Sequence, residues 1–87
     1  MGLEIVELII SIEETFDIAI DNEEASKVVT VNDCYKLILS NLVKIEDKSW
    51  NDEQVWDKMK ELLVYQLGVK PEDVIPEADF IKDLGAD

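Results

Sequence analysis

Residues 3–16 read LEIVELIISIEETF, a stretch with the hydrophobic pattern of an amphipathic helix. Its apolar side chains recur every three or four residues, and at about 100° per residue this spacing places them on one broad face. The residues of this inward face are Ile5, Leu8, Ile9, Ile12 and Phe16. A helix with such a face is stable only when other elements cover it, so the stretch predicts a packed core around this helix.

The same helix carries a second apolar stripe, which we call the outward ridge: Leu3, Val6 and Ile10. These three residues fall roughly opposite the inward face. Carboxylates lie beside or between the two stripes, namely Glu4, Glu7, Glu13 and Glu14. The ridge residues are either scattered surface side chains, or packed under a loop, or a docking surface for a partner. We favour docking, with apolar contacts for affinity and flanking acids that orient a basic partner.

A second long helix is predicted over residues 31–42, because Thr30 and Asp33 have the spacing of a capping box. Its inward residues are expected to be Val31, Cys34, Tyr35, Ile38 and Leu42. Before it, the segment NEEASK fits a short helical turn capped by Asn22. The two predicted elements add one long and one short helix to the first.

A third long helix is predicted over residues 52–67, after a polar linker at residues 43–51. Asn51 and Gln54 cap its start, and Gly68 supplies a C-terminal stop. The side chains expected to face inward are Val55, Met59, Leu62, Leu63 and Leu67.

The rest of the chain, after Gly68, holds both prolines and no sustained hydrophobic period, so it is predicted to be a loop. Its expected anchors in the core are Val74, Ile75, Phe80, Ile81 and Leu84. The fold class is therefore all-α: one domain, a small four-helix bundle of three long helices and one short helix.

The composition excludes several classes of function. Twenty-one Asp and Glu against eight Lys and Arg give a net charge of −13, which disfavours nucleic acid and anionic membranes as partners. The chain has no histidine, no glycine-rich phosphate loop and no nucleophile–base pair, so we expect no catalytic residues, no metal site and no enzyme activity. One cysteine, Cys34, sits among apolar neighbours and fits a buried thiol in a reducing compartment, the cytoplasm or an organelle matrix. No apolar run is long enough to span a membrane.

Two parts of the chain resemble the acyl carrier proteins of fatty-acid and polyketide synthesis, in reversed order. The segment ELLVYQLGVKPEDVIPEADFIKDLGAD resembles the family's first half, and LEIVELIISIEETFDIAIDNEEASKVVTVNDCYKLI resembles its second half. Residues 1–42 then match the second half, residues 52–87 match the first, and residues 43–51 join the parental termini. The resemblance implies a circularly permuted bundle of acyl-carrier type.

Members of this family carry acyl thioesters on a 4′-phosphopantetheine arm attached to a serine. In the family, a Leu-Gly-Ala-Asp loop runs into a Ser-Leu pair, so Asp87 would lie next to Gly2, and Gly2 occupies the position of the serine. Because glycine has no hydroxyl, the resemblance implies a carrier scaffold of fatty-acid or related acyl synthesis that cannot be loaded with the arm. The site residues that it implies for partner binding are Leu3, Glu4, Val6, Glu7, Ile10, Glu13, Glu14 and Asp87.

The expected partners are basic surfaces of acyl-chain synthesis enzymes and of the phosphopantetheinyl transferase, again by resemblance. An alternative is an acidic helical interaction module that carries no cargo. We expect a monomer, with a domain-swapped dimer as the other possibility, because a permuted helix can pack into a neighbouring chain.

Overall fold

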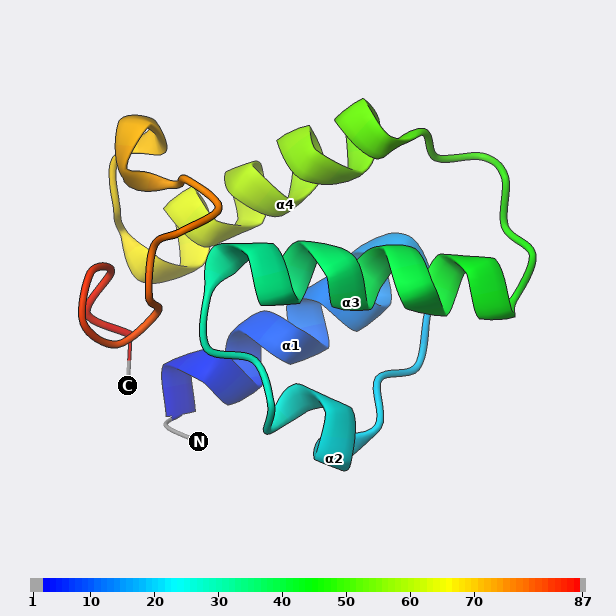
Figure 1. Ribbon diagram of the computed structural model, residues 1–87, viewed down its shortest axis with the longest axis horizontal. Helices are drawn as coiled ribbons and strands as arrows, with labels where there is room; N and C mark the ends of the chain where they lie inside the picture. The colour runs from blue at the N-terminus through cyan, green and yellow to red at the C-terminus, as the bar shows by residue number, and fades with distance from the viewer. Residues whose placement is uncertain (1–2, 87) are drawn as a thin grey trace.

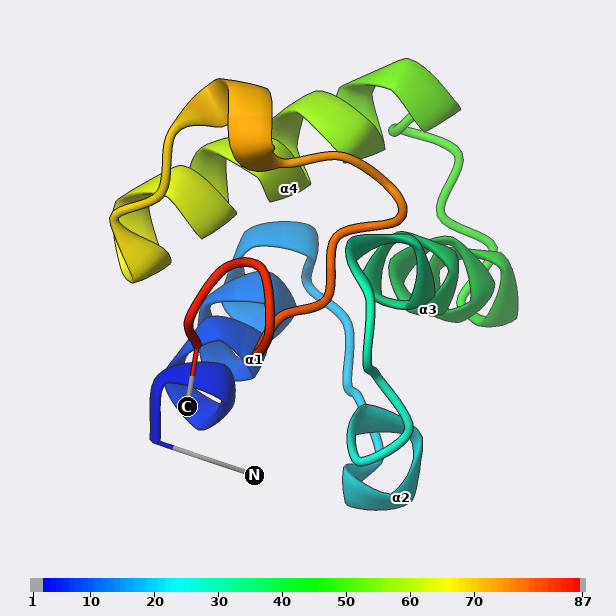
Figure 2. The ribbon, with the colours of Figure 1, turned by 60° about the vertical axis from the view of Figure 1, so that its left-hand side comes forward.

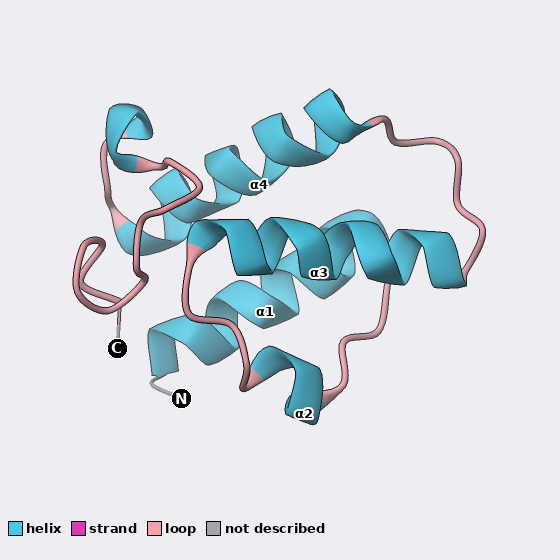
Figure 3. Cartoon of the chain, in the orientation of Figure 1, coloured by secondary structure: helices cyan, strands magenta, loops and turns pink. Residues whose placement is uncertain are grey.

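The computed structural model describes residues 3–86, and this part of the chain is all-helical, as predicted. Three long helices and one short helix are followed by a 3₁₀ turn (Figure 1). Their bounds are α1 Leu3–Phe16, α2 Asn22–Ala25, α3 Val31–Lys44, α4 Asp52–Leu67 and the 3₁₀ turn η1 Pro71–Asp73. Within residues 3–86 Figure 3 contains helices and loops without a strand, although Thr30 and Asp79 form one isolated antiparallel bridge.

The core lies between α1, α3 and α4, and the inward face of α1 is buried in it as predicted. α4 crosses over α1, and α3 lies beside these two helices (Figure 2). Every inward residue expected on α3 and α4 is either buried or half-buried against the core. The half-buried ones are Tyr35, Leu62 and Leu67. The apolar periodicity therefore predicted the helical part of the core correctly.

The ends of α3 and α4 follow from local side-chain chemistry. Thr30 Oγ1 accepts a hydrogen bond from the Asp33 N–H at 3.2 Å, and the Asp33 carboxylate accepts one from the Thr30 N–H at 3.1 Å. Asn51 and Gln54 form the same reciprocal pair at α4, at 2.8 and 3.0 Å. Gly68 ends α4 with φ 67°, in the left-handed region that favours glycine. Both predicted capping boxes and the glycine stop are confirmed.

The predicted cap of the short helix is wrong by one residue. Asp21, with extended backbone, caps α2 by accepting a hydrogen bond from the Glu23 N–H at 3.4 Å, and Asn22 is the first helical residue. Both residues suit an N-cap, and their backbone conformations decide which one takes the role. α3 also continues to Lys44, two residues into the polar segment that was predicted to be a linker.

The linker contributes to the core through one aromatic side chain. Trp50, half-buried, packs against Phe16 at the end of α1 with ring centroids 4.6 Å apart. Such tilted aromatic pairs stabilise a fold beyond the area that they bury. The segment between α3 and α4 is therefore tied to α1.

Three of the five predicted loop anchors are buried: Val74, Phe80 and Leu84. The other two predictions are wrong, because Ile75 and Ile81 are 48% and 66% exposed. Two alanines, Ala78 and Ala86, are buried in their place. In a segment without a helical or strand period, the size of a side chain does not reveal the direction in which it points.

Backbone hydrogen bonds hold the loop against the start of α3. The Phe80 N–H donates to the Val29 carbonyl, and the Val31 N–H donates to the Ala78 carbonyl, each at 3.0 Å. The Asn32 N–H donates to the Pro76 carbonyl, also at 3.0 Å. From this attachment the loop turns so that its described end lies against the first turn of α1 in both Figure 1 and Figure 2.

Candidate functional site

The outward ridge is exposed. Leu3 is 72%, Val6 38% and Ile10 48% accessible to solvent, whereas the inward face of the same helix is buried. The three side chains follow one another at helical spacing and form a continuous apolar strip along α1. Exposed apolar strips that are bordered by polar side chains are typical of protein interaction sites.

The carboxylates that border this ridge belong to α1, which itself carries no cation. Residues 3–16 contain no Lys or Arg, and Glu4, Glu7 and Glu14 are exposed. Within residues 3–86, both ion pairs that form lie elsewhere, between Lys44 and Glu24 and between Lys58 and Glu61. The acids beside the ridge therefore leave a negative potential on this side of the molecule.

Glu13 differs from the other three acids of α1. It is half-buried, and its Oε2 accepts a hydrogen bond from the Ile20 N–H at 2.9 Å. The Glu13 carbonyl also accepts from the Ile18 N–H at 3.1 Å, just after Asp17 takes a positive φ of 54°. Glu13 thus stabilises the turn that follows α1 by accepting hydrogen bonds from it. Its position in an acidic stretch of the sequence did not reveal this structural role.

The loop that approaches α1 is held in one conformation by two aspartates. Asp79 Oδ1 accepts hydrogen bonds from the Ile81 and Lys82 N–H groups, both at 2.9 Å. The Asp83 carboxylate accepts from the Asp79 N–H at 2.7 Å. The hydrogen bonds from Lys82 and then Ile81 lower the pKa of Asp79. The end of the loop closes with the Ala86 N–H donating to the Phe80 carbonyl at 2.8 Å.

Gly2 and Asp87, which the resemblance to acyl carrier proteins implies are neighbours, lie outside the described residues. The structure therefore describes the two segments that lead to this point, α1 and the loop, up to Ala86. Partner binding by the predicted site residues stays a prediction.

Reactive groups are scarce in the described part of the chain. Burial raises the pKa of the Cys34 thiol to about 12, so the sulfur is a protonated thiol near neutral pH. Residues 3–86 contain no group of three or more acidic or cysteine side chains placed to hold a metal ion. None of the helices in this range is both long and apolar enough to cross a bilayer.

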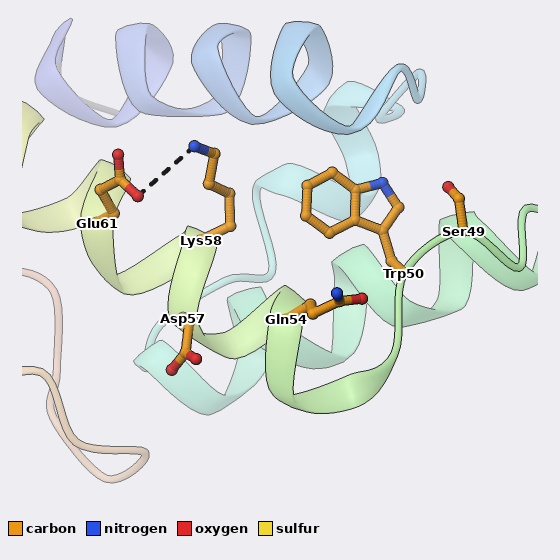
Figure 4. Close-up of a pocket in the computed structure, with 6 residues that line it drawn as sticks. All are labelled: Ser49, Trp50, Gln54, Asp57, Lys58 and Glu61. Atoms are coloured by element: carbon orange, nitrogen blue, oxygen red, sulfur yellow. Dashed lines mark ion pairs between the residues drawn. The ribbon is translucent and has the colours of Figure 1, made fainter.

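One pocket of about 530 Å³ lies beside the linker and α4 (Figure 4). Trp50 projects from the linker on one side, and Lys58 pairs with Glu61 at 3.5 Å on the other. The remaining lining residues are Ser49, Gln54 and Asp57. In this pocket the Lys58 ammonium is paired with Glu61, and the Trp50 ring is packed on Phe16.

Comparison with known proteins finds a partial sequence match to acyl carrier proteins. An acyl carrier protein from Desulforapulum autotrophicum is 56% identical over 37 residues, which make up 42% of this chain and 48% of that protein. The chain thus spans about half the length of this curated relative. No family model and no solved structure matches the chain. The partial homology, together with the all-helical fold, supports a relationship to acyl carrier proteins at a coarse level.

Proposed function

We propose that this chain is a carrier scaffold of acyl-carrier type, not an enzyme, in which the two halves of the family's fold follow one another in reversed order. The partial match to an acyl carrier protein is the observation on which the proposal chiefly rests. Gly2 takes the place of the serine that bears the 4′-phosphopantetheine arm in the family. The chain therefore keeps the bundle and its partner surface, and does not accept the arm.

The reversed order has support from the arrangement of the elements. The loop that ends in Leu84, Gly85 and Ala86 and the first turn of α1 are at opposite ends of the sequence and lie against one another (Figures 1 and 2). α3 and α4, which would hold the parental termini, are joined by the short segment 45–51. A cut at a loop-to-helix junction is well tolerated because few contacts cross it.

The outward ridge and its bordering acids form the proposed partner surface. Apolar contacts at Leu3, Val6 and Ile10 supply affinity, and Glu4, Glu7 and Glu14 steer a basic surface into position. By resemblance, the partners are the enzymes that load and process acyl chains in the cytoplasm or in an organelle matrix. The absence of an attachment serine does not alter this surface, so docking and loading are separable properties.

Loading is tested by mass spectrometry after incubation with coenzyme A and a phosphopantetheinyl transferase. The wild-type chain is expected to keep its mass, and Gly2→Ser is expected to gain one arm, located on residue 2 by peptide mapping. Arm attachment to the wild-type chain would overturn the proposed role of Gly2. A Gly2→Ser variant that folds and still stays unmodified would overturn the acyl-carrier proposal itself.

Docking is tested with a matched pair of variants, Val6→Lys on the ridge and Val43→Lys on α3. Both valines are exposed, Val6 at 38% and Val43 at 76%, so both variants are expected to fold. Calorimetry with the transferase as the basic partner should show weaker binding for Val6→Lys, by about tenfold or more, and unchanged binding for Val43→Lys. Equal losses in the two variants would mean that net charge, not the ridge, governs the interaction.

The alternative is an acidic interaction module without any relation to cargo, as a monomer or as a swapped dimer. It shares the docking result and predicts that Gly2→Ser remains unmodified. Light scattering determines the mass in solution, and a dimer would favour exchange of α1 between chains.

A further inference from the structure

A second pocket lies on another side of the molecule, where the start of α3, the start of α4 and the loop meet. It has a volume of about 310 Å³ and a mostly apolar lining. Its lining residues are Asn32, Tyr35, Asp52, Glu53, Trp56 and Pro76. This volume is at the lower end of the range for ligand sites in proteins, so it suits a small group rather than a long chain.

Two aromatic rings form the walls of this pocket. The rings of Tyr35 and Trp56 have centroids 5.4 Å apart and stand at 89° to one another. Two rings at a right angle make a corner, and the negative faces of aromatic rings attract cations. Methylated ammonium groups bind in such corners because their charge is spread over an apolar surface that the rings can contact.

The walls are held in place before any ligand arrives. The Tyr35 hydroxyl donates to the backbone carbonyl of Asp52 at 3.3 Å, which joins α3 to α4 at the pocket. The Asn32 N–H donates to the Pro76 carbonyl at 3.0 Å, which attaches the loop to α3 at the pocket. A site that is already ordered loses little conformational freedom when it binds.

The charge at the rim has the sign that a cation requires. Asp52 and Glu53 are exposed at the pocket edge, and two full negative charges outweigh the partial positive charge at the start of α4. Burial, and after it the charge of Asp52, raises the pKa of the Tyr35 phenol. The field of the Asp52 carboxylate therefore reaches the aromatic wall.

We propose that the pocket between Tyr35 and Trp56 binds a methylated ammonium group, with the two rings contacting the methyl groups and Asp52 and Glu53 balancing the charge. This site is separate from the outward ridge and does not depend on the proposed carrier function. Its natural ligand is a quaternary ammonium compound or a methylated lysine side chain.

The first test is a titration with tetramethylammonium chloride, followed by the ¹H–¹⁵N NMR signals of the chain at constant ionic strength. The Trp56 indole and the amides around residues 32–35 and 52–56 are expected to shift, whereas the indole of Trp50 serves as the internal control. The neutral isostere tert-butanol and the small, strongly hydrated ammonium ion are each expected to bind about tenfold more weakly or worse. Equal binding of tert-butanol would reduce the site to a plain apolar pocket and overturn the proposal.

Variants separate the rings from the charges. Trp56→Leu removes one wall and is expected to abolish the shifts at residues 32–35. Asp52→Asn/Glu53→Gln keeps both rings and is expected to weaken binding several-fold, with circular dichroism confirming the fold. The matched control Asp57→Asn/Glu61→Gln removes the same charges from the same helix outside the pocket. Equal weakening by the two double variants would mean that the total charge attracts the cation, against the proposed site.

The source of the ligand is distinguished by two further titrations, with choline and with Nε-trimethyl-lysine in a short peptide. Tighter binding of choline identifies a small quaternary ammonium compound, and tighter binding of the peptide identifies a modified protein. Either result supports the assignment of the head group. Failure of both compounds to shift Trp56 overturns it.

Discussion

The two faces of α1 are made of the same kinds of side chain and have opposite fates. Ile12 and Leu8 are buried in the core, whereas Ile10 and Leu3, on the same helix, are exposed to solvent. Burial of an aliphatic side chain contributes roughly 1.5–3 kcal/mol, and an exposed one contributes little. The apolar character of a side chain on α1 therefore does not tell whether it stabilises the core or is available for docking. Its angular position around the helix determines which of these two roles it has.

Truncation of an isoleucine is expected to destabilise the fold far more on the buried face of α1 than on the exposed one. Ile12→Ala removes a fully buried side chain and is expected to lower the free energy of unfolding by about 2 to 5 kcal/mol. Ile10→Ala removes the same atoms from the outward ridge and is expected to lower the free energy of unfolding by only about 0.5 kcal/mol. Urea denaturation measures both free energies of unfolding, and equal losses would mean that the position of a side chain around α1 does not determine its contribution to stability.

The acids of α1 are expected to divide in the same way. Glu13→Ala removes the acceptor for the Ile20 N–H and should destabilise the fold by about 1 to 2 kcal/mol. Glu14→Ala, one residue along, removes an exposed carboxylate and should leave stability nearly unchanged. Both changes bring the same gain in helix propensity, so the difference isolates the hydrogen bond. A lower melting temperature for Glu14→Ala than for Glu13→Ala would mean that Glu14, and not Glu13, is the acid that stabilises the fold.

A pH titration extends this division to Asp33, which belongs to the structural class. The N–H groups of Thr30 and then Val29 lower its pKa below the ordinary value of 3.8. A carboxyl with a lower pKa in the folded state stabilises the fold above its unfolded pKa, and that contribution disappears as the pH falls through the folded value. Wild type should therefore exceed Asp33→Asn in stability at pH 6, by about 1 kcal/mol or less.

This gap between wild type and Asp33→Asn should shrink below pH 3.8, which urea melts at several pH values can follow. Self-repulsion changes with pH in both proteins and largely cancels in the difference. A gap that stays constant down to pH 2 would show that the Asp33 charge contributes nothing to the cap.

The smallest effect concerns the outward acids as a group. Glu7→Gln/Glu14→Gln changes the net charge from −13 to −11, since two charges are removed. Added salt should raise the melting temperature of the wild-type chain because it screens self-repulsion, and the double variant should gain less from the same salt. A salt-independent wild-type melt would indicate that the charges are too dispersed to repel one another.

Local signals in the sequence predicted most of the helical structure. The caps at Thr30, Asn51 and Gly68 lie within a few residues of the groups that they satisfy, so their spacing alone identified the ends of α3 and α4. The outward position of the ridge also followed from periodicity. Its binding role remains a prediction, since docking depends on a partner.

The errors arose where contacts are long-range. Ile75 and Ile81 are larger than the two alanines of the loop, yet they are exposed, and Ala78 and Ala86 are buried. The loop is positioned by hydrogen bonds to the start of α3, such as that from the Val31 N–H to the Ala78 carbonyl, and residue spacing does not reveal these bonds. Trp50 was assigned to a polar linker because its partner, Phe16, is distant in sequence. The same holds for the corner between Tyr35 and Trp56, which forms only when α3 and α4 pack.

The proposed reversed order of an acyl-carrier-type bundle requires that residues 2 and 87 lie close together in one folded chain. Nuclear Overhauser effects between the protons of Gly2–Leu3 and those of Ala86–Asp87 would measure this proximity. We expect cross-peaks between the two segments within one chain of a monomer. If the cross-peaks are absent, or appear only between labelled and unlabelled chains of a mixed sample, the proposed reversed order within one chain is wrong.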